Sequence, residues 1–137
     1  MKKILVPVDG SEYSLRALER AKGLGEFYKA EITLLTVIYS GHFNYFESQK
    51  EVLESEEKIS QDRLLEASKV LEDYPYGYKT VAKLGDTSNE IITMAEEEDF
   101  DLIVIGSRGH GTFARALLGS VSQKVVSHAN TTVMVVR

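Results

Sequence analysis

The chain of 137 residues, with 43% hydrophobic and 27% charged residues, is typical of one globular domain over residues 1–137. Its formal net charge of −5 argues against a nucleic-acid-binding surface, and no apolar run approaches the roughly 20 residues of a membrane-spanning helix. With no cysteine and no signal-peptide pattern after Met1, we expect a cytoplasmic protein that has no disulfides and no structural metal site. We also expect it to bind neither nucleic acid nor a membrane.

The first apolar run, KILVPV at residues 3–8, predicts a buried strand. Pro7 lacks the N–H of a sheet ladder, so we expect pairing to end near it. Asp9 follows at the mouth of the strand, where it either shapes an Asx turn or contacts a ligand. Ser11 is a suitable N-cap for a helix that continues to about residue 29. The apolar spacing predicts a buried face on this helix, formed by Ala17, Ala21, Leu24 and Tyr28.

A second strand is predicted over residues 32–38 and a long helix over residues 48–73. The buried stripe of that helix lies in its second half, at Leu64, Ala67 and Leu71. An aromatic-rich loop from Tyr39 to Phe46, which contains Phe43 and Tyr45, lies between the two elements. Such aromatic side chains either anchor the following helix to the core or wall a base pocket.

The third strand is predicted over residues 78–84, where alternating residues and two lysines favour a position at the edge of the sheet. Thr87 and Glu90 then have the spacing of a capping box, which predicts a helix over residues 88–98.

The glycine-rich segment after the fourth strand carries the strongest chemical signal. Residues 102–105, LIVI, predict a strand buried on both faces, and the spacing that follows is Gly-x2-Gly-x9-Gly-Ser, from Gly106 to Ser120. A glycine turn leading into a helix N-terminus binds phosphate, because backbone N–H groups can approach the anion and the helix dipole favours it. The alternative is a loop with only a structural role. Neither the Walker loop nor the dinucleotide fingerprint is present.

The last predicted strand begins at Thr131 and ends at Val136, and it carries no charge. At a sheet edge it would need cover, either from a loop or helix or from the same strand of a second copy. Strands alternating with helices predict an α/β fold, a doubly wound five-stranded parallel sheet of order 3-2-1-4-5 with helices on both faces. This order places the Asp9 turn beside the Gly106 turn, at the strand ends where such sheets bind ligands.

These features together resemble the universal stress protein family over the entire chain. The resemblance rests on VPVDGS at residues 6–11, the glycine spacing of the family's ATP-binding branch, and the valine-rich last strand. It implies the strand order above, a homodimer through the last strand, and binding of ATP or a related adenine nucleotide.

The resemblance also assigns site residues by position. Contacts near the nucleoside fall on Pro7, Val8 and Asp9. Backbone contacts to the base fall on Thr36 and Val37. Ribose and phosphate neighbours are Gly106, Arg108 and Gly109. The phosphates are expected against Gly119, Ser120, Val121 and Ser122.

The function expected from these residues is an adenine-nucleotide-binding stress-response or signalling module that acts as a homodimeric switch. Mg²⁺ would be bound through phosphate oxygens, with Asp9, Ser120 or Ser122 nearby. His110 and Arg115 offer further positive charge. No residue is compelled to activate water, so no catalytic residue is assigned. A slow ATPase or autokinase, and an interaction module that needs no nucleotide, remain the alternatives.

Overall fold

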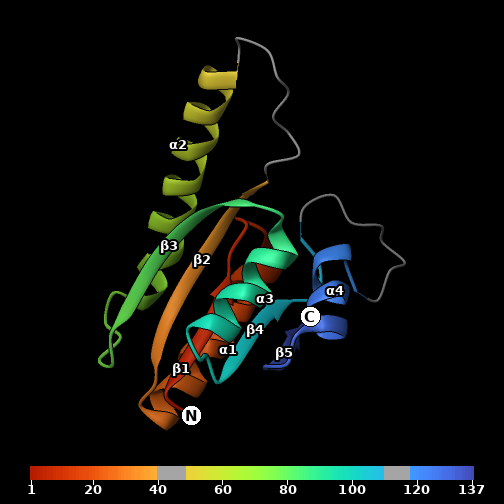
Figure 1. Ribbon diagram of the computed structural model, residues 1–137. Helices are drawn as coiled ribbons and strands as arrows, with labels where there is room; N and C mark the ends of the chain where they lie inside the picture. The colour runs from red at the N-terminus through yellow and green to blue at the C-terminus, as the bar shows by residue number, and fades with distance from the viewer. Residues whose placement is uncertain (40–48, 110–117) are drawn as a thin grey trace.

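In a computed structural model, residues 1–39, 49–109 and 118–137 are described, and their strands form one sheet (Figure 1). The strand order is β3-β2-β1-β4-β5 with every pair parallel, which confirms the predicted topology. The strands are β1 (Lys3–Pro7), β2 (Glu31–Tyr39), β3 (Tyr78–Gly85), β4 (Leu102–Gly106) and β5 (Thr132–Val136). The helices are α1 (Glu12–Tyr28), α2 (Gln49–Ser68), the 3-10 helix η2 (Lys69–Leu71), α3 (Thr87–Glu97) and α4 (Ser120–His128).

Helices cover both faces of the sheet, as the sequence predicts. Alternate residues of β1 divide the core: Ile4 and Val6 face the side that carries α1 and α2, whereas Leu5 faces α3 and α4. Leu18 of α1 and Ile91 of α3 are fully buried on these two sides. The central strands therefore lie in a dry interior and present only their ends to ligands.

Strands β1 and β4 separate toward their C-terminal ends. Their pairing covers Ile4 with Leu102 and Leu5 with Ile103, and it stops before Pro7. On the other side of β1 the ladder continues, because the Val8 N–H donates to the Leu35 carbonyl at 2.8 Å. Since N–H groups alternate along a strand, the missing donor of Pro7 falls on the β4 side. The sheet thus opens where the strand order reverses.

The helix starts are fixed by short polar side chains. Ser11 caps α1 as predicted, with its hydroxyl accepting the Ser14 N–H at 3.2 Å. The predicted capping box at Thr87 is wrong. Asp86 is the N-cap of α3, and its carboxylate accepts the Asn89 N–H at 3.1 Å, so Thr87 is already the first helical residue.

Two further details of the helices differ from the sequence prediction. Tyr28 is 47% exposed, because the buried face of α1 continues from Ala21 to Gly25 and not to Tyr28. Tyr74 lies beside Gly25 and donates from its hydroxyl to the Ala30 carbonyl. The long helix is α-helical only to Ser68 and continues as η2. Its predicted buried stripe is confirmed at Leu64, Ala67 and Leu71.

Strands β3 and β5 are the two edges of the sheet, as predicted. On β3, Lys79 pairs with Glu31 at 3.3 Å, whereas β5 carries only uncharged residues, with Met134 37% exposed. Among the described residues, no helix is long and apolar enough to cross a membrane. The predicted aromatic wall at Phe43, Tyr45 and Phe46 lies outside the described residues.

Candidate functional site

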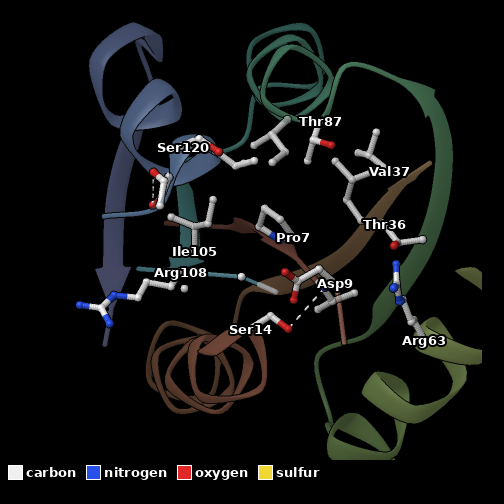
Figure 2. Close-up of a pocket in the computed structure, with 18 residues that line it drawn as sticks. Pro7, Asp9, Ser14, Thr36, Val37, Arg63, Thr87, Ile105, Arg108 and Ser120 are labelled. Atoms are coloured by element: carbon white, nitrogen blue, oxygen red, sulfur yellow. Dashed lines mark hydrogen bonds between the residues drawn. The ribbon is translucent and has the colours of Figure 1, made fainter. Parts of the chain in front are cut away.

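A cavity of about 300 Å³ lies at the C-terminal ends of β1, β2 and β4 and at the N-terminus of α4 (Figure 2). The structure brings all of the predicted site residues together there: Pro7, Val8, Asp9, Thr36, Val37, Gly106, Arg108, Gly109, Gly119, Ser120, Val121 and Ser122. Further lining residues that the sequence did not reveal are Ser14, Leu35, Arg63, Thr87, Ile91 and Ile105. Segments far apart in the chain therefore converge on one hollow of ligand size.

The Asp9 turn is held by a local hydrogen-bond network. The Asp9 carboxylate accepts the Ser11 N–H through Oδ1 at 2.8 Å, which is the Asx turn expected for a short carboxylate. The Asp9 N–H faces the Ser14 hydroxyl at 3.4 Å, and that hydroxyl donates to the Ser11 carbonyl at 3.0 Å. Asp9 also lines the cavity. Its turn geometry and a ligand-facing position therefore coexist.

Two glycines permit close approaches at the opposite side of this turn. A Cβ on Gly109 would collide with Oδ2 of Asp9. A Cβ on Gly106 would lie 2.8 Å from the carbonyl carbon of Tyr13 and 2.9 Å from its oxygen, which belong to the backbone of α1. Glycine is thus required at Gly106 for α1 to pack against the end of β4, whereas at Gly109 it leaves room for the Asp9 carboxylate.

The α4 N-terminus offers backbone donors. Gly119 is the N-cap and supplies no side-chain acceptor, and the N–H groups of Ser120 and Val121 have no hydrogen-bond partner among the described residues. These groups are therefore suited to binding an anion. The Gly119 N–H donates to the Ser107 carbonyl at 2.7 Å, and the buried Ser122 hydroxyl donates to the same carbonyl at 2.8 Å. The hydroxyl of Ser122 therefore orients the turn, while Ser120 is exposed at the helix start and lines the cavity.

The other end of the cavity is formed by the end of β2 and by α2. Thr36 is buried, with Val37 next to it on the strand. Arg63 reaches this end from α2, and Figure 2 shows its guanidinium beside Thr36 and far from Ser120. Within the described part of the chain, Arg63 makes no hydrogen bond or ion pair.

Arg108 follows the glycine turn and lies against an aromatic ring. Its guanidinium carbon is 6.0 Å from the ring centroid of Tyr13, and that of Arg16 is 5.2 Å from the same centroid. Figure 2 shows the Arg108 guanidinium pointing away from Asp9. The other predicted cations, His110 and Arg115, lie outside the described residues. Among residues 1–39, 49–109 and 118–137, no group of three or more His, Asp or Glu side chains could hold a metal.

The wall between the two ends is formed by the start of α3. Thr87 and Ile91 line the cavity, and Asp86 caps the helix behind them. Hydrogen bonds from the Asn89 N–H and the Ser88 hydroxyl hold the pKa of Asp86 below its ordinary value. Lys124 of α4 lies 3.6 Å from the same carboxylate, which ties the two helices together beside the site.

Some of the lining residues that the sequence analysis missed could have been predicted from their position on the strands, and others could not. Ile105 stands at the predicted C-terminal end of a strand, and Thr87 follows the third strand, so the rule for ligand sites in parallel sheets could have found them. Leu35 lies in the middle of the predicted second strand, so this rule does not select it. Arg63 lies in mid-helix among charged residues and carries no such signal.

Known proteins are similar to this chain over its length. The sequence profile described as Universal stress protein family matches residues 1–137. Universal stress protein MJ0531 of Methanocaldococcus jannaschii is 33% identical, over 99% of this chain and 82% of that protein. The structure of universal stress protein UspA from Lactobacillus plantarum superposes with a TM-score of 0.91 at 27% identity, covering 99% of this chain and 97% of that one. A universal stress protein in complex with cAMP is 26% identical, with a TM-score of 0.78, and covers 99% of this chain and 97% of that one. With a family match over its whole length, this chain belongs to the universal stress protein family.

Proposed function

We propose that this protein binds an adenine nucleotide, ATP in the first instance, and acts as a stress-response or signalling switch. The observation that carries the proposal is the convergence of the Asp9 turn, the glycine turn and the α4 N-terminus on one cavity. A family member with 26% sequence identity is described in complex with cAMP, which supports the adenine nucleotide as the ligand class.

The chemistry of the lining residues suggests how the nucleotide would lie. The phosphates would accept hydrogen bonds from the backbone N–H groups of Ser120 and Val121, where the helix dipole favours negative charge. The base would then lie toward Thr36 and Val37, with Asp9 near the ribose. Because Asp9 is the only carboxylate among the described residues that line the cavity, Mg²⁺ would be bound mainly through phosphate oxygens.

The proposed switch is a homodimer formed through β5. This strand is a sheet edge without charge, and Met134 is 37% exposed on it. An uncovered apolar edge is a favourable place for pairing with a second copy about a two-fold axis. Sedimentation of the wild type and of Met134→Lys should give a dimer and a monomer, and a monomeric wild type would contradict the dimer. A cytoplasmic setting stays a prediction from the sequence.

The nucleotide proposal is tested directly on purified protein. The protein is denatured, any released nucleotide is identified by chromatography and mass spectrometry, and the stripped protein is titrated with ATP and Mg²⁺ by calorimetry. We expect a retained adenine nucleotide or micromolar affinity for ATP. Folded protein that binds neither ATP nor cAMP would overturn the proposal. Following ADP after ATP is added separates a binding module from a slow ATPase.

A further inference from the structure

Arg63 reaches the cavity from α2, an element that carries none of the predicted nucleotide contacts. Its side chain is partly buried and also lines a second cavity, of about 600 Å³, between α1 and α2. Val8 and Ser14 are the other residues that line both hollows. Arg63 therefore forms part of the wall between the candidate nucleotide site and the second cavity.

The guanidinium of Arg63 has no partner among the described residues, although acidic side chains are close by. Three acidic residues, Glu12, Asp62 and Glu66, also line the second cavity. Glu12 is paired with Arg16 at 2.6 Å and Glu66 with Lys69 at 2.9 Å, whereas Asp62 is exposed and makes no ion pair with Arg63. A partly buried cation that has no partner among the described residues loses hydration and gains no interaction from them in return. Such a group is suited to an interaction that a ligand supplies.

The position of Arg63 in the cavity indicates which part of a bound nucleotide its guanidinium would contact. Figure 2 shows Arg63 and Ser120 at opposite ends of the cavity, with Pro7 and Asp9 between them. If the phosphates occupy the α4 N-terminus, the guanidinium lies at the end that receives the base. A guanidinium is planar and weakly hydrated, and it stacks on aromatic faces, including those of nucleobases.

We propose that Arg63 is a nucleobase-contact residue, whose planar guanidinium packs against the base and closes the cavity toward α2. This inference rests on the proposed function, since it takes the ligand to be a nucleotide with its phosphates at α4. It adds a contact from an element that lies outside the glycine motif and the β1 turn.

The test measures affinities of the stripped protein for AMP, ADP and ATP, with wild type, Arg63→Gln and Arg63→Lys. A base contact predicts that Arg63→Gln weakens all three nucleotides by the same factor, about tenfold, because the lost stacking does not depend on the number of phosphates. Arg63→Lys keeps the charge and loses the plane, so we expect it to weaken binding as well. Arg20→Gln, an exposed arginine of α1 that lines neither cavity, is the matched control.

The outcomes separate this inference from the function on which it rests. A loss that grows with the number of phosphates would assign Arg63 to the phosphates and overturn the base contact. Unchanged affinity in Arg63→Gln would also overturn it, while binding by the wild type would leave the proposed function standing. Full affinity in Arg63→Lys would show that the positive charge, and not stacking of a planar group, makes the contact, and it would overturn the stacking interaction proposed here. A wild type that binds no nucleotide would overturn both. Thermal melting of each variant confirms that the comparison is made on folded protein.

Discussion

The two ends of the cavity differ in the atoms that line them: one is lined mainly by backbone, the other by side chains. At one end, Gly106, Gly109 and Gly119 present backbone, and each is fixed by a close approach or a hydrogen bond to Tyr13, Asp9 or Ser107. At the other end, the wall consists of side chains from β2 and α2. A backbone wall depends on missing Cβ atoms and cannot be varied, whereas a side-chain wall can change without disturbing the fold. We expect substitutions at the first end to cost stability and those at the second to change ligand preference.

The largest effect is expected for Gly106→Ala, at the glycine end. The added Cβ would lie 2.8 Å from the Tyr13 backbone, so α1 or β4 must shift, and we expect a loss of about 2–3 kcal/mol in the free energy of unfolding. Urea denaturation measures this loss. The matched control is Gly23→Ala on α1, where nothing lies within 4 Å and alanine should stabilise the helix by about 0.5–1 kcal/mol. Equal stability of the two variants would show that the end of β4 is not held as tightly as the geometry indicates.

A smaller loss is expected for Ser122→Ala. The buried Ser122 hydroxyl donates to the Ser107 and Gly119 carbonyls at 2.8 and 3.1 Å, and removing it should cost about 1–1.5 kcal/mol. The exposed Ser127 of the same helix is the control, since Ser127→Ala should leave stability nearly unchanged. Differential scanning calorimetry compares the two variants. A loss confined to nucleotide affinity, with no change in melting temperature, would instead make Ser122 a ligand contact.

Gly109→Ala tests whether the glycine end is needed for the ligand as well as for the fold. The methyl group would push against Oδ2 of Asp9, and a side-chain carboxylate can move more easily than a helix backbone. We therefore expect a stability change below that of Gly106→Ala and a loss of about tenfold in ATP affinity, about 1.4 kcal/mol. Isothermal titration provides the measurement, and unaltered affinity in this variant would remove Gly109 from the proposed site.

The smallest effect is expected at Asp86, on the wall between the two ends. Its pKa is held below the ordinary value by bonds from Asn89 and Ser88. The stability that it contributes is therefore fully present above the unfolded value of about 3.9 and is lost as the pH falls through the lower folded value. Asp86→Ala should lose about 1 kcal/mol at pH 7 and progressively less below pH 4. Asp86→Asn keeps a capping acceptor but lacks the titrating carboxylate, so its loss should be smaller than that of Asp86→Ala and should shrink in parallel below pH 4 in the same urea titrations. A pH-independent loss in Asp86→Ala would contradict this account.

The same division between backbone and side chains explains what the sequence could predict. Parallel strand order follows from alternating elements, and glycine spacing marks positions where backbone must come close, so the sheet and the glycine end were predictable. Asp9 was predictable as a turn residue, and its Asx-turn hydrogen bond from the Ser11 N–H is the one that the residue type favours.

Contacts between distant side chains were not predictable in this way. Arg63 is one charged residue among many on α2, and only the packing of that helix beside β2 places it at the cavity. Thr87 was misread as a cap because Asp86, Thr87 and Ser88 all have capping side chains, and local sequence alone does not decide which of them begins the helix. The packing at the end of α1 involves Tyr74, which reaches Gly25 and Ala30 from a segment far along the chain, so apolar spacing within the helix misplaced Tyr28 on the buried face.

The central position of β1 has a consequence for synthesis of the protein. β1 is synthesised before β4, so this neighbour is absent until Leu102, the partner of Ile4, has been made. The cleft between the two strands, and the α4 N-terminus that completes it, cannot exist before the chain has passed Ser122. Pairing across so long a separation is slow, and one side of β1 stays unpaired meanwhile. A ligand held in this cleft therefore cannot assist folding until the chain has been made through Ser122.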